Sequence, residues 1–238
     1  EIPLRLVGSE MCIRDSTEAL LIIARELAPG GLLEPLLQQI NVILVPRANP
    51  DAVEAGTRNA ADGTDIARVA AALPGVDALV HAAGVLRVGP LGQLDHAGGE
   101  LMWRLHVDAA TRLADAIVPG MAQRGQGRVV FIGSRVAQGM AGRGQYAATK
   151  AALIALARSW AAEVAAQGVT VNVVSPAATA TGMLNDPARQ GSAPRLPPIG
   201  RLIEPAEIAA LVGFLLSESA AAITGQDIAI CGGSSLAR

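Results

Sequence analysis

Aromatic residues, charges and cysteines are all scarce in this sequence. Aromatic residues make up 2% of the 238 positions and charged residues 17%, and the formal net charge is −2. The sequence has no cluster of lysine and arginine, so no basic patch for binding nucleic acid is expected. Its two cysteines, Cys12 and Cys231, are far apart and match no metal-binding spacing, which is typical of a reduced cytoplasmic protein. No apolar run reaches the length of a membrane span.

Small and aliphatic residues are abundant instead, and 51% of the chain is hydrophobic. From residue 66 onward, apolar runs of strand length alternate with longer helical patterns. Strands are expected near 77–82, 128–132, 170–174 and 227–230, and helices over 94–123, 145–168 and 204–218. Because strands joined by crossover helices pair in parallel, the predicted fold class is α/β, with a doubly wound, mostly parallel, Rossmann-like sheet.

The only tyrosine lies four residues before a lysine, in the segment QYAATK at 145–150. On a helix, Tyr146 and Lys150 share one face. A phenol has a pKa of about 10 in water, and a neighbouring ammonium lowers it, which makes tyrosine a usable general acid or base. Ser134 ends the preceding predicted strand, at the sheet edge where ligands bind in such folds. The spacing also fits an ordinary helix in which Tyr146 is half-buried and Lys150 is solvated.

From about residue 62 to its end, the chain resembles the classical short-chain dehydrogenase/reductase family. Four ordered segments carry the resemblance: DALVHAAG at 77–84, GSRVAQGMAGRGQYAATKAAL at 133–153, VTVNVVSPAATAT at 169–181, and PIGRLIEPAEIAALVGFLLSESAAAITGQDIAICGG at 198–233. The resemblance implies reversible hydride transfer between NAD or NADP and an alcohol/carbonyl pair of a small-molecule substrate. It also implies a homo-tetramer, because the family usually assembles through its two long helices and its C-terminal segment.

The resemblance further implies a role for each matching residue. Tyr146 would donate or accept the substrate proton, and Ser134 would hold the carbonyl oxygen. Lys150 would bind the nicotinamide ribose and lower the pKa of the tyrosine. The small residues Ala82, Ala83 and Gly84 would let the backbone approach the cofactor. The nicotinamide and phosphate side would be lined by Pro176, Ala177, Thr179 and Thr181.

Three positions depart from the family pattern. His106 replaces the asparagine that is the family's fourth catalytic residue. An imidazole can also donate and accept hydrogen bonds, so His106 either continues a proton relay or is a helix residue without a catalytic part. His81 replaces the first asparagine of Asn-Asn-Ala-Gly, and Ala177 replaces the glycine of Pro-Gly; both changes are expected to be tolerated. His96 is expected to be an ordinary surface residue.

The N-terminal part lacks the Gly-rich turn that grips a dinucleotide. Residues 1–75 contain no Gly-x-x-x-Gly-x-Gly after an apolar strand, and no residue there distinguishes NAD from NADP. A helix is expected near 17–28 and a strand near 41–46, and the strand ends in PRANPD at 46–51. In this pattern, residues 17–65 resemble a fragment of a zinc metallocarboxypeptidase. That family's zinc ligands are missing, so no metal site is expected. Asp62 fits either the adenine-contacting aspartate of the reductases or the peptidase fragment.

These observations predict a chimera of an atypical, truncated N-terminal segment, residues 1–65, and a reductase-like catalytic part, residues 66–238. VGSEMCIRDS at 7–16 resembles translated sequencing adapter, and the absence of an initial Met and of a signal-peptide pattern indicates a fragment. The alternative is that residues 1–65 are a divergent, genuine half-domain. Two functions follow: an oxidoreductase impaired by the loss of its cofactor loop, or a non-catalytic α/β remnant that binds no dinucleotide.

Overall fold

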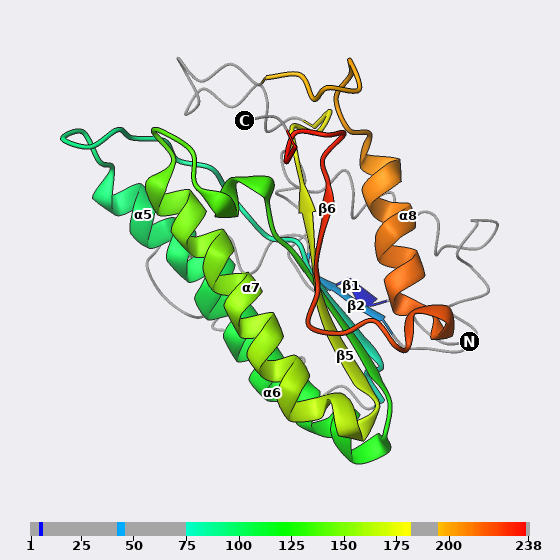
Figure 1. The fold of residues 1–238 in the computed structure, drawn as a ribbon. Coiled ribbons are helices and arrows are strands. Elements are labelled where there is room, and N and C mark those ends of the chain that lie inside the picture. The colour runs from blue at the N-terminus through cyan, green and yellow to red at the C-terminus, as the bar shows by residue number, and fades with distance from the viewer. Residues whose placement is uncertain (1–4, 7–41, 46–74, 182–194, 237–238) are drawn as a thin grey trace.

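The computed structural model describes residues 5–6, 42–45, 75–181 and 195–236 (Figure 1). Asp62 and the helix predicted near 17–28 lie outside these ranges. Within the described ranges, the chain forms one sheet with helices on both of its faces. No helix in these ranges is long and apolar enough to cross a membrane.

In the part of the chain that the structure describes, the sheet has six strands, all parallel, and their order in space follows their order in the chain. The strands are β1 (Arg5–Leu6), β2 (Val42–Val45), β3 (Ala78–His81), β4 (Gly127–Ile132), β5 (Val169–Pro176) and β6 (Asp227–Ile230). Each of the five predicted strands is present, with boundaries within two residues of the prediction. They could be found from sequence because a strand covered on both faces is a continuous apolar run.

Three successive helical segments connect β3 to β4. They are α5 (His96–Trp103), the π-helical turn η1 (Arg104–Asp108) and α6 (Ala109–Arg124). The sequence predicted one helix over 94–123, and the π turn in its middle is a difference from that prediction. A π turn widens the helix by a single residue, which barely alters the hydrophobic pattern, so the sequence did not reveal it. His106 lies in this widened turn.

The remaining helices follow β4 and β5. A 3-10 turn, η2 (Arg135–Gln138), precedes α7 (Gly144–Val164), which ends in a 3-10 turn, η3 (Ala165–Gln167). Gly168 then takes the left-handed conformation, with φ of 74°, that ends helices and favours glycine. After β5 come α8 (Pro205–Leu216) and the 3-10 turn η6 (Glu218–Ala220). Pro205 begins α8 after the Glu204 cap, as Pro favours the first helical position.

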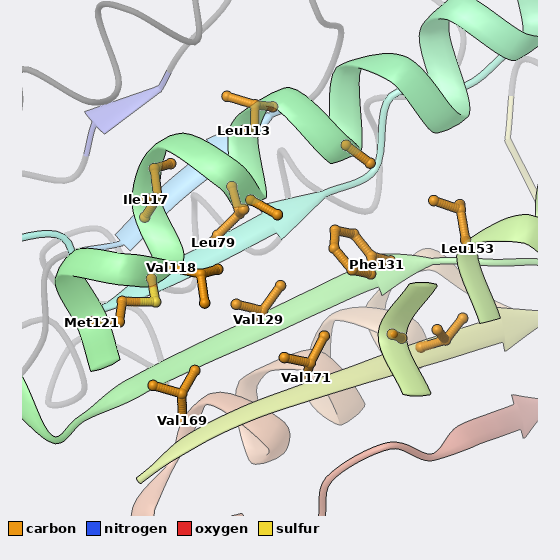
Figure 2. Close-up of a cluster of buried hydrophobic side chains, with 14 of the residues drawn as sticks. Leu79, Leu113, Ile117, Val118, Met121, Val129, Phe131, Leu153, Val169 and Val171 are labelled. Carbon is orange, nitrogen blue, oxygen red and sulfur yellow. The ribbon is translucent and has the colours of Figure 1, made fainter. Parts of the chain in front are cut away.

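Two separate hydrophobic cores lie on the two faces of the sheet. Alternate residues of a strand point to opposite faces, so Leu79 and Phe131 pack beneath α6 and α7, whereas Val80 and Val130 pack beneath α8. Figure 2 shows the first core, in which Leu113, Ile117 and Met121 of α6 lie over β3 and β4. In Figure 1, α5, α6 and α7 accordingly lie on one side of the sheet and α8 on the other. This arrangement confirms the predicted α/β class with a parallel sheet.

Candidate active site

The predicted site residues gather at the carboxyl ends of β3, β4 and β5, which are neighbouring strands. Ala82, Ala83 and Gly84 follow β3, Ser134 comes two residues after β4, and Pro176 is the last residue of β5. The Gly133 amide donates to the Val174 carbonyl at 2.8 Å, which continues the pairing of β4 and β5 up to Ser134. Parallel strands place all their carboxyl ends on one edge, so residues distant in sequence meet there.

Tyr146 and Lys150 lie on the same face of the first turns of α7 and are both buried. The Lys150 side chain is 3% exposed, and its Nζ donates to the Ile132 carbonyl at the end of β4, at 2.9 Å. Nζ is also 5.8 Å from the centre of the Tyr146 ring. The prediction that the two side chains share one face is confirmed. The alternative with a solvated lysine does not match this buried ammonium.

Burial has a strong effect on the lysine. It lowers the pKa of Lys150 from 10.5 to about 7, because the charged form loses its hydration inside the protein. Within the described residues, Nζ has one hydrogen-bond acceptor, the Ile132 carbonyl, although an ammonium has three donors. Two donors of Lys150 are therefore available, among these residues, for hydroxyl groups of a bound molecule.

His106 connects β3 to α7 through two hydrogen bonds. Its ring is fully buried, and Nε2 accepts from the Val85 amide, just beyond β3, at 3.0 Å. Nδ1 lies 2.8 Å from the Thr149 hydroxyl, which in turn donates to the Tyr146 carbonyl at 2.8 Å. The His106 and Tyr146 rings pack edge to face, with centres 5.6 Å apart and planes at 87°. Burial, with smaller effects of Lys150 and His81, holds the pKa of His106 well below its usual value.

Gly84 lies against both His106 and Lys150. A Cβ at this position would be 3.1 Å from His106 Nε2 and 3.4 Å from Lys150 Nζ. A methyl group would therefore be tight against the His106 ring, which would have to shift by a few tenths of an ångström, and in contact with the Lys150 ammonium. Ala83 is buried in the first core, and Ala82 packs at the edge of the second. This run of small residues keeps the end of β3 close to the lysine, as the predicted cofactor approach requires.

Ser134 and Tyr146 carry the two hydroxyl groups of the predicted constellation, and both residues are buried. Ser134 caps the η2 turn, where its Oγ accepts from the Val136 amide at 3.2 Å, and this bond leaves the hydroxyl hydrogen available to donate. Tyr146 packs in a third apolar cluster with Leu86, Met102, Val136 and Ala147. Because Val136 belongs to both environments, the serine turn and the tyrosine are in contact through it.

Beyond β5, the chain turns through the residues predicted to line the nicotinamide side. The Ala177 amide donates to the Ile230 carbonyl of β6 at 3.2 Å, and the Thr179 hydroxyl donates to the Ala177 carbonyl at 3.0 Å. Thr179 also pairs with Ile203 in an isolated parallel bridge, and the Thr181 amide donates to the Thr179 carbonyl at 2.8 Å. The segment 176–181 is thus fixed by main-chain hydrogen bonds at the same edge as Ser134.

His81 is buried behind the site and held differently from His106. Its Nε2 lies 3.2 Å from the Leu105 carbonyl in the π turn, so this nitrogen carries the hydrogen. Nδ1 is buried without a hydrogen-bond partner among the described residues. Burial is the main cause that lowers the pKa of His81 to about 4, and Lys150 contributes. His96, by contrast, is exposed at the start of α5, as predicted for an ordinary surface residue.

Comparison with known proteins shows the family of this chain. A family model described as Enoyl-(Acyl carrier protein) reductase matches residues 50–235. A solved structure titled "short chain dehydrogenase/reductase family protein" is 33% identical, with a TM-score of 0.72 over 92% of this chain and 93% of that one. This chain belongs to the short-chain dehydrogenase/reductase family. The matching family model and the relatives below are named as reductases, so the predictions of family and of enzyme class are confirmed.

Several curated relatives share the name 3-oxoacyl-(acyl-carrier-protein) reductase. The 3-oxoacyl-(acyl-carrier-protein) reductase FabG of Vibrio cholerae serotype O1 is 38% identical over 189 residues, which are 78% of this chain and 73% of that protein. The enzyme of the same name from Escherichia coli (strain K12) is 39% identical over 162 residues, 66% of each chain. The match thus spans about two thirds to three quarters of the length of these relatives.

Sequence reasoning missed three contributors to this candidate site. They are the Thr149 hydroxyl, the Val85 amide and the Ile132 carbonyl, which hold His106 and Lys150. Thr149 could have been noticed, because it lies one helical turn after Tyr146. The two main-chain groups have no sequence signal. Within the ranges that the structure describes, no group of three or more His, Cys, Asp or Glu residues could hold a metal ion.

Proposed function

We propose that this chain carries the catalytic part of an NAD(P)-dependent reductase that interconverts a carbonyl and an alcohol. The observation that supports it best is the buried Lys150, which lies against both the Tyr146 ring and the end of β4. The relatives named 3-oxoacyl-(acyl-carrier-protein) reductase favour a 3-oxoacyl thioester on an acyl carrier protein as the substrate. The apolar cluster around Tyr146 suits the aliphatic part of such a substrate.

In this proposal, the chain's own residues handle the proton, and a bound nicotinamide cofactor supplies or takes the hydride. The Tyr146 hydroxyl donates its proton to the carbonyl oxygen as that oxygen gains negative charge. The Ser134 hydroxyl donates a hydrogen bond to the same oxygen and fixes its position. Lys150 stabilises the phenolate that remains, because an adjacent positive charge favours the charged form of the phenol. The reverse reaction uses the same groups in the opposite order.

The residues at the end of β3 and at Lys150 fit a nicotinamide ribose. Two donors of Lys150 are unused among the described residues, and ribose hydroxyls are their natural acceptors. Gly84 provides the close backbone approach beside this ammonium. We assign the neighbouring contacts with the cofactor to residues that lie at the same edge: Ala82, Ala83, Pro176, Ala177, Thr179 and Thr181.

We further propose that residues 1–65 are a foreign segment and that the chain grips a dinucleotide weakly. Residues 1–75 contain no Gly-x-x-x-Gly-x-Gly, so the usual main-chain donors for the pyrophosphate are missing from the sequence. The family match begins at residue 50, so residues 1–49 lie outside it, whereas residues 50–65 lie inside it. The competing function is a remnant that binds no dinucleotide. Fluorescence titration with NADH and NADPH distinguishes the impaired reductase from the remnant. It is carried out on this chain and on a chain whose residues 1–61 come from an ordinary family member.

The catalytic assignment is tested by Tyr146→Phe in the chain with the replaced N-terminal segment. This change removes only the hydroxyl, so turnover of a 3-oxoacyl thioester should fall at least about a hundredfold, the usual contribution of a positioned acid or base. Trp103→Phe is the matched control, because Trp103 is a half-exposed aromatic residue at the end of α5. Equal activity of Tyr146→Phe and Trp103→Phe would contradict the assignment. Micromolar NADPH binding by the unaltered chain would contradict the proposed weakness of its N-terminal part.

A further inference from the structure

The hydrogen-bond partners of His106 determine which ring nitrogen carries the proton. The Val85 amide can only donate, so Nε2, 3.0 Å away, must present its lone pair. The hydrogen of the neutral ring is then on Nδ1, which faces the Thr149 hydroxyl at 2.8 Å. That hydroxyl donates to the Tyr146 carbonyl, so its lone pair is free to accept from Nδ1. All three hydrogen bonds therefore run in one direction, from the Val85 amide to the Tyr146 carbonyl.

In this arrangement, the His106 ring has no free nitrogen that could accept a proton and pass it on. Both nitrogens are occupied, and the side chain has no exposed surface. A proton added to Nε2 would point an N–H at the Val85 N–H, and two donors would then face each other. The neighbouring ammonium of Lys150 opposes a second positive charge, and burial also lowers the pKa of His106. A relay through this imidazole would require the Val85 hydrogen bond to break in each turnover.

We propose that His106 and Thr149 are positioning residues that hold the first turn of α7, and with it Tyr146, against the end of β3. The proposal rests on the function proposed above and deepens it. Three parts of the chain meet at the imidazole: the segment after β3 through Val85, the π turn that carries the ring, and α7 through Thr149. The edge-to-face contact between the His106 and Tyr146 rings adds a direct packing contact. Tyr146 is thereby fixed in orientation while the ring stays neutral.

His81 provides a natural contrast within the same site. Its Nε2 donates to the Leu105 carbonyl, whereas its buried Nδ1 has no partner among the described residues. The two buried histidines are therefore expected to be opposite tautomers, with the hydrogen on Nε2 in His81 and on Nδ1 in His106. A chain with only three histidines makes this difference directly measurable.

The first experiment is ¹⁵N NMR of the unaltered chain labelled at histidine, with signals assigned by His81→Asn and His96→Asn. We expect His106 to carry its hydrogen on Nδ1 and to be neutral at pH 6.5, where an ordinary histidine is half protonated. An Nε2–H tautomer, or an imidazolium at pH 7, would overturn the proposal. This measurement needs neither cofactor nor substrate, so its result stands even if the proposed reductase function fails.

The second experiment compares Thr149→Val, Thr149→Ser and Thr111→Val in the chain with the replaced N-terminal segment. Valine keeps the shape of Thr149 but removes the hydroxyl and with it the hydrogen bonds to His106 and to the Tyr146 carbonyl, so kcat should fall about tenfold, with KM within about twofold. Serine should restore kcat. Thr111→Val is the control, because the Thr111 hydroxyl also donates to a helix carbonyl, that of Val107, at 2.8 Å, but lies outside the site.

Two readouts separate positioning from a proton relay and from mere loss of folding. Thr149→Val should leave the pH dependence of kcat unchanged, because no titrating group is lost; a displaced profile would support a relay and overturn the proposal. The NMR ring signal of Tyr146, the only tyrosine, should move in Thr149→Val and not in Thr111→Val. An unmoved signal in Thr149→Val would also overturn the proposal. If every variant lacks turnover, the proposed function fails, and the tyrosine signal still decides the positioning.

Discussion

Lys150 should titrate near pH 7 in the folded chain, and it can be followed without interference because it is the only lysine. Its side chain is 3% exposed, and burial lowers its pKa from 10.5 to about 7. In a chain labelled with ¹³C at the lysine Cε, a single NMR resonance should report this titration. A midpoint above pH 9.5 would show that the ammonium remains hydrated and would refute the reasoning.

The same titration predicts how the free energy of unfolding depends on pH. Between pH 7 and 10.5, the unfolded chain holds a proton at Lys150 that the folded chain releases, so stability rises with pH in this window and is lost as the pH falls towards 7. A tenfold change in a proton-binding constant is worth about 1.4 kcal/mol, so the whole window amounts to roughly 5 kcal/mol. Between pH 7 and 9, the free energy of unfolding should rise by roughly 2 kcal/mol. This range lies below the ordinary pKa of a phenol, so it avoids the titration of tyrosine.

The slope of the free energy of unfolding against pH can be measured by urea unfolding at pH 7, 8 and 9. The background for this measurement has Cys12 and Cys231 replaced by serine. Lys150→Met removes the charge and keeps the length of the side chain, so the slope should disappear. The Ile132 carbonyl then loses its donor, which costs about 1–3 kcal/mol at every pH and does not affect the slope. Arg112→Met, which removes an exposed cation paired with Asp108, is the control and should keep the slope. If Lys150→Met keeps it too, another group controls the pH dependence.

Two further predictions concern the neighbours of Lys150. Gly84→Ala should lower the free energy of unfolding by about 1–3 kcal/mol, because its methyl group would press on His106 and Lys150. Gly144→Ala is the control and should not lower it, because nothing lies within 4 Å of the added carbon. Equal urea midpoints of the two variants would contradict this prediction. The low pKa of His81, about 4 against 6.5 unfolded, should reduce stability by up to about 3 kcal/mol as the pH falls from 6.5 to 4. His81→Asn should remove the share of this acid sensitivity that His81 contributes in urea unfolding, while the share of His106, whose pKa is also lowered by burial, should remain. An unchanged loss would exclude His81 as a source.

The sequence by itself determined the parallel sheet and most of its helices. Strands such as β4 and β5 are buried on both faces and are therefore continuous apolar runs, which local patterns detect. The spacing of Tyr146 and Lys150 placed both on one helix face, because the α-helical repeat alone decides this. The close approach of the backbone at the small residues 82–84 was implied by the resemblance of this segment to the family motif. Each of these inferences depends on residues that are near one another in the chain.

Only the tertiary structure decided the environment of those residues. Lys150 is buried because its ammonium reaches the end of β4, and no local pattern distinguishes this from a solvated lysine. His106 meets Val85 across 21 positions and Thr149 across 43, so its tautomer depends on how β3, the π turn and α7 pack together. Whether a polar group is charged, neutral or fixed depends on desolvation and on its hydrogen-bond partners. Both are set by contacts between distant segments, which a reading along the chain does not contain.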